Sequence, residues 1–291
     1  MIRHLFAADR VRFGRRRDLW ILVALVPVIL AVMFVADFNG VTTPPQFDFF
    51  MDPPDPVAEA ESRAQMLADW RQQMLTQVPA FAFPASLLKV AGNFGPVILL
   101  SIYLATALVA GEFEWGTVRT VHLTSQRGRT LAVRVGVVGI LIGVVIGIGL
   151  LFATIIPFLL SVEGAPLQGY AAPVAAFWTE LANRIVILLP FIAVPVLMAV
   201  VARSIGAAFL LTLLFFVADL AVTGAPIWPT SFVPWVPAVT VSGSIARLVG
   251  GDNSAQALVA PAAVSFAALL AWAVVPVAAA IALFRRIDLN E

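Results

Sequence analysis

The sequence predicts an all-α integral membrane protein with six transmembrane helices, and three observations carry this prediction. Of the 291 residues, 61% are apolar and 12% are charged, whereas soluble domains average about 45–50% and about 25%. The mean hydropathy is +0.97. Charge-free apolar runs recur along the chain, and about 20 such residues let a helix cross a hydrocarbon core of about 30 Å. These observations exclude a soluble globular domain and a disordered chain.

The residue types that most catalytic and metal sites need are scarce. The chain has no Cys, and its only imidazoles are His4 and His122, too far apart for a local metal-binding motif. The single lysine, Lys89, lies outside the glycine frame of a phosphate-binding P-loop. The nearest match to a serine-nucleophile elbow, residues 241–244, lacks flanking strands and a nearby His, so we expect a small-residue turn there. The sequence therefore predicts no enzyme and no catalytic, cofactor-binding or metal-binding residue.

The ends of the spans are set by the charged residues that interrupt the apolar runs. Asp18 precedes the first run and Lys89 precedes the second. Pro190 and Pro195 lie inside the fourth run, where neighbouring helices can accommodate the carbonyl groups that proline leaves without a partner. The predicted spans cover residues 19–38, 90–111, 132–162, 180–202, 204–224 and 257–284.

Three segments outside the spans are also expected to contact the membrane. Residues 1–18 mix Leu5 and Phe6 with several Arg, which favours a helix lying in the interface over a solvated basic tail. Residues 39–89 form a polar outer loop with a helix over about 57–77. Four Pro within residues 225–239 exclude one continuous helix there, so short re-entrant or interfacial helices are expected before the last span.

The distribution of basic residues predicts the orientation. With six spans, thirteen Arg face one side: six before the first span, four within residues 112–134, Arg203, and Arg285 with Arg286. Four basic residues face the other side. Because basic loops stay on the cytoplasmic side, both termini are expected in the cytoplasm. The preference for Arg over Lys is typical of a GC-rich bacterial genome, so we expect a multi-pass protein of the bacterial plasma membrane.

Small residues in the third span predict a close helix crossing. Gly139, Gly143 and Gly147 recur every four residues, so one face of the helix lacks side chains and a second helix can approach it closely. The spacing leaves open whether the second helix belongs to this chain or to a second copy.

Three ionisable residues stand in or near apolar segments: Glu180, Arg184 and Asp219. A charge at mid-bilayer costs about 2.5–3.5 kcal/mol, so each needs a partner, water or an interface. Glu180 and Arg184 are four residues apart with the acid first, which favours an interfacial ion pair over a transport role. Asp219 is expected nearer the outer boundary, as a structural charge or as part of a polar path.

Residues 112–131, between the second and third spans, carry the most informative pattern. They contain Glu112-Phe113-Glu114-Trp115-Gly116-Thr117-Val118-Arg119, followed by Ser125-Gln126-Arg127-Gly128-Arg129. Two carboxylates and an aromatic side chain leave the membrane on the side expected to be positive, beside a Gly-Thr step that can cap a short helix. An acidic, aromatic bend of this kind suits a groove on a partner protein.

This segment resembles the cytoplasmic coupling loop of type-2 ATP-binding-cassette (ABC) transporter permeases, in which acidic residues, Gly-Thr, a short helix and a Ser-Arg turn lead into the third span. The resemblance extends to the interfacial helix, the six spans that would form a transmembrane domain over 19–284, and the re-entrant outer helices. It includes Phe284-Arg285-Arg286-Ile287-Asp288, which would open a cytoplasmic tail at 285–291. The Ser-Arg turn lacks the usual proline, Arg134 replaces a common Lys, and the outer loop is longer than in drug-efflux members.

The resemblance implies a permease subunit of an exporter that moves a lipophilic or amphipathic substrate, such as a drug, lipid or peptide. A separate ABC ATPase subunit would bind ATP and Mg and hold the coupling helix in a groove. A second permease copy, identical or related, would complete the path among membrane lipids, and no nucleic acid is expected. The residues expected to contact the ATPase are Glu112, Glu114, Trp115, Gly116, Thr117 and Arg119.

An autonomous secondary transporter or channel is the alternative, with Asp219, Glu180 or Arg184 as coupling charges. The sequence has no recognisable inverted repeat and no convincing cluster of charges at mid-span, which argues against it. A membrane anchor or sensor is a third class, but it would not account for the Pro-rich segment before the last span.

Overall fold

The structure is a computed structural model that describes residues 17–44, 56–81, 95–114, 127–159, 174–224, 235–250 and 261–286. Within these ranges every regular element is a helix, and six segments are long and apolar enough to cross a membrane. The prediction of a multi-pass, all-α membrane protein is therefore confirmed at this level. The predicted interfacial helix at 1–18 lies outside the described residues, except for Arg17 and Asp18, which belong to the first helix described.

The helices follow the predicted order of spans. The spans are α2 (Arg17–Thr42), α5 (Gly95–Glu114), α7 (Arg127–Leu159), α8 (Val174–Leu188) followed by α9 (Pro190–Ala202), α10 (Ile205–Thr223) and α13 (Ala262–Arg286). The remaining described helices are α3 (Pro56–Phe81), within the predicted outer loop, and the short helices α11 (Val236–Val239) and α12 (Val241–Gly250), before the last span.

Several helices extend beyond the ends of the predicted spans. Helix α5 continues to Glu114 and α7 begins at Arg127, so the predicted loop 112–131 is helical at both of its ends. The predicted tail 285–291 is shortened in the same way, because α13 includes Arg286, and α2 extends to Thr42 into the predicted outer loop. Apolar runs mark where hydrocarbon ends, whereas a helix continues as long as its backbone hydrogen bonds do.

The fourth span, predicted over 180–202 with Pro190 and Pro195 inside it, consists of two helices in succession. The interruption falls at Leu189, immediately before Pro190. Proline has no N–H to donate, and here the Leu189 N–H donates to the Val186 carbonyl at 3.2 Å instead. Leu189 keeps a helical backbone, with φ −57° and ψ −45°. The span therefore changes its hydrogen bonding at this point while the backbone stays helical.

The turn expected at residues 241–244 is also wrong. Ser242, Gly243 and Ser244 form the beginning of α12, which starts at Val241. A run of small residues fits a turn or a helix start equally well, and here a carboxylate from α10 supplies the hydrogen bonds that a helix start needs, as described below.

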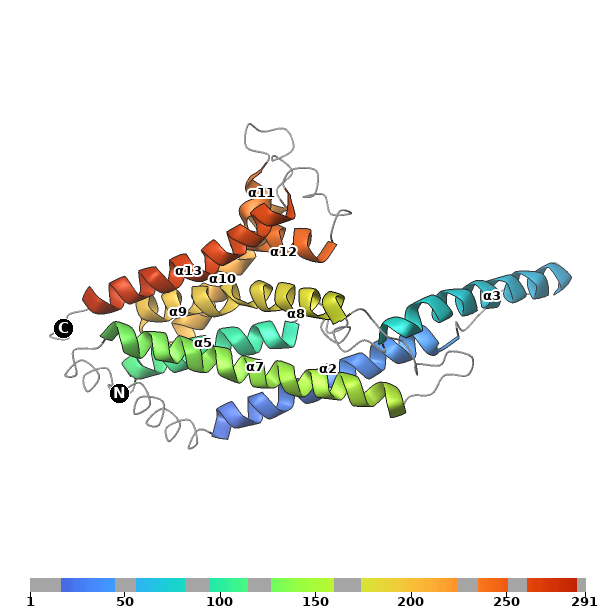
Figure 1. Ribbon diagram of the computed structural model, residues 1–291, viewed down its shortest axis with the longest axis horizontal. Coiled ribbons are helices and arrows are strands. Elements are labelled where there is room, and N and C mark those ends of the chain that lie inside the picture. Colours follow the sequence, from blue (N-terminus) through green and yellow to red (C-terminus); the bar gives the residue numbers. More distant parts are fainter. Residues whose placement is uncertain are drawn as a thin grey trace. The chain divides into compact units, whose positions relative to one another are not determined.

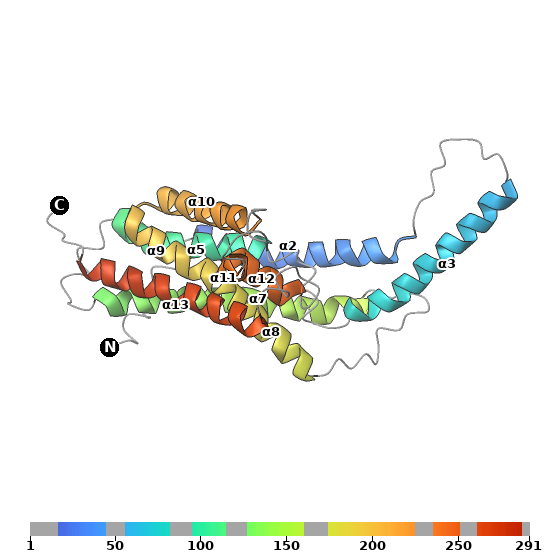
Figure 2. The ribbon, with the colours of Figure 1, turned by 90° about the horizontal axis from the view of Figure 1, so that it is seen from above.

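The chain forms two compact units. Unit 1 comprises residues 1–23, 97–144 and 181–291, and unit 2 comprises 24–96 and 145–180. Unit 2 contains α3 and most of α2. In unit 1, α9 lies between α10 and α13 and packs against both (Figure 2). Helices α11 and α12 pack at the end of the unit where α13 begins (Figure 1).

The core of unit 1 joins helices that are distant in sequence. Its buried apolar side chains come from α5, α8, α9, α12 and α13, and they are Ile102, Val186, Ile187, Phe191, Val241 and Leu269. Phe216 of α10 stacks against Phe191 with ring centroids 4.5 Å apart. This core joins five helices of unit 1.

Candidate functional site

Three consecutive residues at the end of α5 each contact a different helix of unit 1. Successive residues of an α-helix point about 100° apart, so three in a row cover most of its circumference. We call these residues and their partners the α5-end cluster. The pairs are Glu112 with Arg134 of α7, Phe113 with Phe284 of α13, and Glu114 with Ile205 of α10.

The first contact is a buried ion pair. An oxygen of Glu112 lies 2.9 Å from a guanidinium nitrogen of Arg134, and the two side chains are only 8% and 5% exposed. A second guanidinium nitrogen of Arg134 donates to the Leu108 carbonyl at 3.5 Å. Because an unpaired charge is very costly in an apolar setting, the pair holds the end of α5 against the beginning of α7.

The second contact caps a helix. One carboxylate oxygen of Glu114 accepts a hydrogen bond from the backbone N–H of Ile205 at 2.7 Å. Ile205 begins α10, and Ser204 before it is extended and makes no side-chain cap. The first N–H groups of a helix have no partner within the helix, and the helix dipole favours a negative charge there. Glu114 of α5 therefore supplies the cap that Ser204 does not.

The third contact is aromatic and lies beside a close helix approach. The rings of Phe113 and Phe284 meet edge to face, with centroids 5.8 Å apart and an angle of 89°, a geometry that aromatic pairs favour. At Gly128, the second residue of α7, a Cβ would lie 2.8 Å from Nε of Arg285 and 3.2 Å from Ile281 of α13. The absence of a side chain at Gly128 thus lets α7 approach α13 closely.

The predicted ATPase-contact residues fall into three groups. Glu112 is buried and paired within the chain. Glu114 is exposed, with one oxygen used by Ile205. The other four predicted contacts, Trp115, Gly116, Thr117 and Arg119, lie outside the described residues. The roles of Arg134, Phe284 and Ile205 could not be predicted from the sequence, because their partners come from distant segments.

At the other end of α10, Asp219 has a clear structural role. It is 8% exposed, and its two carboxylate oxygens accept the backbone N–H groups of Val241 at 3.0 Å and Ser242 at 2.7 Å. Of the two predicted roles for Asp219, a structural charge or part of a polar path, this geometry favours the structural one.

The remaining predicted charges are less fully described. Arg184 is buried in α8 with 4% exposure. Glu180 belongs to the same helix, but its side chain lies outside the described residues, so the predicted ion pair between them stays a prediction.

The glycine face of α7 is open in this chain. A Cβ built at Gly139, Gly143 or Gly147 would meet no atom within 4 Å. Among the described residues, therefore, no helix of this chain occupies the face where the sequence predicts a close crossing. The alternative in which a second copy supplies the helix stays a prediction.

The contacts of the α5-end cluster hold helices together, and the pairs described above do not form a catalytic arrangement. Within the described ranges, no group of three or more His, Asp or Glu side chains lies close enough to hold a metal ion. The two His of the sequence, His4 and His122, lie outside those ranges. The cluster joins α5 to three other helices by ionic, capping and aromatic contacts.

No protein-family model matches this chain, and no curated protein matches it in sequence.

Proposed function

We propose that this chain is the permease subunit of an ABC exporter in the bacterial plasma membrane. It moves a lipophilic or amphipathic substrate, such as a drug, lipid or peptide, and a separate ATPase subunit binds ATP and Mg. In this proposal the chain is not an enzyme itself. Both termini face the cytoplasm, and a second permease copy completes the path.

One observation carries the proposal: the three sequence segments that resemble type-2 ABC permeases contact one another at one end of unit 1. Phe113 belongs to the acidic segment, Gly128 to the Ser-Arg turn, and Phe284 and Arg285 to the closing motif. Phe113 contacts Phe284, and Gly128 lies against Arg285. Residues 113 and 284, which are distant in sequence, therefore lie together at one end of unit 1, as a coupling loop that acts on several spans would require.

The geometry of the α5-end cluster suits the transmission of movement. Helix α5 ends at Glu114 and α7 begins at Arg127, so residues 115–126 connect two helices that the Glu112–Arg134 pair already joins. A partner that displaces this connection acts on the end of α5. The contacts of Phe113 and Glu114 then pass the displacement to α13 and α10. An ATPase gripping residues 115–119 would thereby act on four spans together.

The test is a pair of substitutions at Glu114. Glu114→Gln keeps an oxygen that can accept the Ile205 N–H but removes the charge that a basic groove on the ATPase would bind. Glu114→Arg reverses the charge and removes the acceptor. We expect both variants to be inserted in the membrane. We expect the Gln variant to lose part of its ATPase binding and substrate-stimulated ATP hydrolysis, and the Arg variant to lose nearly all of both.

The matched control is Glu61→Gln, because Glu61 is exposed on α3, outside the cluster. It should leave ATPase co-purification and ATP-driven transport unchanged. Full transport by the Glu114→Arg variant, or transport by the purified chain without any ATPase, would contradict the proposal. The second result would favour the autonomous transporter instead.

A further inference from the structure

The backbone is broken between α11 and α12, at Thr240. A break in a helix leaves N–H groups and carbonyls without their usual partners, and at membrane depth such groups must be satisfied by protein or by water. Where they are all satisfied by protein, the break can lie in a water-free setting. The partners of these groups therefore show whether the break needs water.

The first four N–H groups of α12 all have protein partners. Val241 and Ser242 donate to the two oxygens of Asp219. Gly243 donates to the Thr240 hydroxyl at 3.1 Å, and Ser244 donates to the Thr240 carbonyl at 3.0 Å. Asp219 reaches these groups from α10, twenty-two residues away from Val241 in sequence. The start of α12 thus needs no water.

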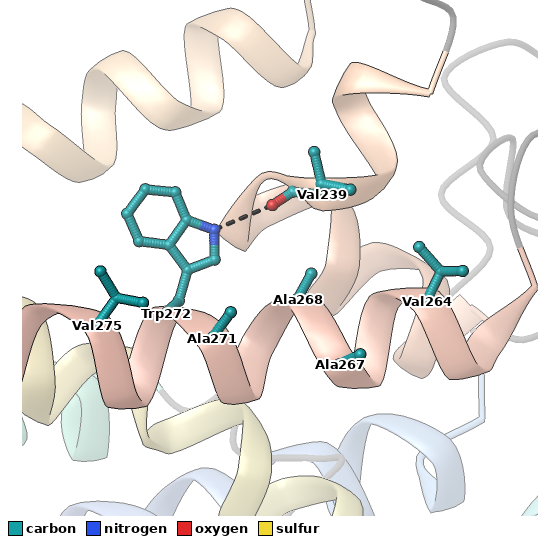
Figure 3. Close-up of a pocket in the computed structure, with 7 residues that line it drawn as sticks. All are labelled: Val239, Val264, Ala267, Ala268, Ala271, Trp272 and Val275. Atoms are coloured by element: carbon teal, nitrogen blue, oxygen red, sulfur yellow. Dashed lines mark hydrogen bonds between the residues drawn. The ribbon is translucent and has the colours of Figure 1, made fainter.

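Three successive carbonyls of α11 are satisfied in the same way. The Pro237 carbonyl accepts from the Thr240 hydroxyl at 2.8 Å, and the Ala238 carbonyl accepts from the Ser244 hydroxyl at 2.9 Å. The Val239 carbonyl accepts from the indole N–H of Trp272 at 2.9 Å (Figure 3). The indole group comes from α13, so the carbonyl end of α11 also obtains its partner from a spanning helix.

Apolar side chains flank the polar groups of the break. Val241 is fully buried and Ala238 is 1% exposed. A hollow of about 470 Å³ beside the break is lined by Val239 and by six α13 side chains between Val264 and Val275, of which only Trp272 carries a polar group (Figure 3). That group is already bonded to the Val239 carbonyl. The wall of the hollow therefore favours hydrocarbon over water.

We propose that Asp219 is a positioning residue that holds α11 and α12 as a water-free hairpin inserted in the membrane, with its carboxylate in the place of solvent at the start of α12. Two N–H groups on one carboxylate and the positive end of a helix favour the negative charge, which offsets the cost of taking it out of water. The hydroxyls of Thr223 and Thr240, 2.7 Å apart, tie α10 to the break a second time.

The absence of Cys from the sequence allows a direct test. A single Ser242→Cys substitution places a thiol on a half-buried residue of α12, so protein alone would not shield it from water. Membrane fragments with both faces open are treated with a charged maleimide, which reacts with thiolates in water and does not enter hydrocarbon. Gln72→Cys on the exposed face of α3 is the water-accessible control, and Leu214→Cys, on an exposed part of α10, is the hydrocarbon control.

With Asp219 intact, we expect the Ser242→Cys thiol to react as slowly as the Leu214→Cys thiol. Adding Asp219→Ala removes two hydrogen bonds to a charged group. This loss should raise the equilibrium constant for opening of the hairpin more than about tenfold, and the labelling rate should rise by at least the same factor. Asp219→Asn keeps one acceptor oxygen and should give an intermediate rate. The Gln72→Cys and Leu214→Cys rates should not change in either background.

Two results would overturn the proposal. If Ser242→Cys reacts as fast as Gln72→Cys while Asp219 is intact, the hairpin lies in water. If labelling is unchanged by both Asp219→Ala and Asp219→Asn, Asp219 does not position it. Should the Ala variant fail to insert, the Asn variant is compared instead with Thr223→Val, which removes the hydroxyl contacts of Thr223 with Thr240 and with the Asp219 carbonyl. Both should label faster than the parent, and equal rates would again overturn the proposal. None of these results depends on an ATPase partner.

Discussion

Glu112 and Arg134 illustrate how charged side chains are retained among apolar helices. Removing a charge from water costs several kcal/mol, and a close partner recovers much of that cost. Both side chains are nearly fully buried and lie 2.9 Å apart. The two residues therefore contribute to stability as a pair. A change of either one alone leaves the other charge buried and poorly paired.

We expect Glu112→Leu and Arg134→Leu each to lower the free energy of unfolding by about 3–5 kcal/mol, because each leaves the other charge buried without its partner. The double variant should lose less than either single variant, since an apolar pair of similar volume is often tolerated at such sites. Thermal unfolding of the parent, the two single variants and the double variant in detergent gives the coupling free energy between the two side chains. Losses that simply add would contradict the ion pair.

Arg203 has a backbone conformation that favours glycine. Its φ of 56° and ψ of 13° place it in the left-handed region, where it ends α9 and its N–H donates to the Ala199 carbonyl. A side chain costs about 1–2 kcal/mol in this conformation, partly offset by the greater freedom of glycine in the unfolded chain. In the tight turn between α9 and α10, glycine at position 203 should therefore be more stable than arginine.

We expect Arg203→Gly to raise the free energy of unfolding by up to about 1 kcal/mol. The control is Arg286→Gly, which also removes an exposed Arg but lies in the last turn of a helix, where glycine should be neutral or destabilising. Unfolding midpoints of both variants in the same detergent decide between a backbone effect and a charge effect. Equal shifts in the two variants would indicate a charge effect.

At the scale of elements, the hairpin of α11 and α12 depends on a position that admits no side chain. A Cβ at Gly243 would lie 1.6 Å from the Pro237 carbonyl oxygen, far inside any permitted contact. The obstacle is backbone, which cannot rotate away as a flexible side chain could. Gly243 thus allows the first turn of α12 to fold back against α11.

We expect Gly243→Ala to destabilise unit 1 by about 3 kcal/mol or more, because the overlap with backbone forces the hairpin to shift. The matched control is Gly206→Ala near the start of α10, where a Cβ would meet no atom within 4 Å. There alanine should stabilise the helix by about 0.5–1 kcal/mol. The two variants are compared by thermal unfolding in detergent, and similar behaviour of both would contradict the described hairpin.

At the scale of the whole molecule, the open glycine face of α7 is the feature that bears on assembly. Gly139, Gly143 and Gly147 meet no atom of the described chain, while apolar side chains beside them such as Ile140 and Val144 are exposed. Bare glycine faces allow close backbone contact between spans. A second permease copy, as proposed above, would find such a face on each chain.

We expect Gly143→Cys to form a disulfide-linked dimer under mild oxidation in the membrane, because the chain has no other Cys. Gly143→Leu should reduce association of two differently tagged copies while leaving thermal stability nearly unchanged, since its Cβ meets only open space. Gly206→Leu, on the exposed start of α10, is the control and should associate normally. Undiminished association of the Gly143→Leu variant would place the interface elsewhere.

Some features of this protein could be read from local patterns. Each span follows from a run of apolar residues, because the thickness of a bilayer is a constraint that the chain meets one segment at a time. The sequence places Pro190 inside the fourth span but does not show that the helix changes its hydrogen bonding there, because proline is often tolerated inside spans. Helix α5 continues past the predicted span end at 111 and α7 begins before the predicted span start at 132, because a helix can extend beyond the hydrocarbon.

The sequence alone determined the class of the molecule, the order of its six spans, and the presence of short helices before the last one, since these depend on composition and on neighbours in the chain. Only the tertiary structure decided that Glu112 pairs with Arg134, that Glu114 caps α10 and that Asp219 caps α12. In each case the partners lie 22 or more residues apart in sequence. Which charge meets which N–H or guanidinium depends on how whole helices pack, and that information is carried by no single segment.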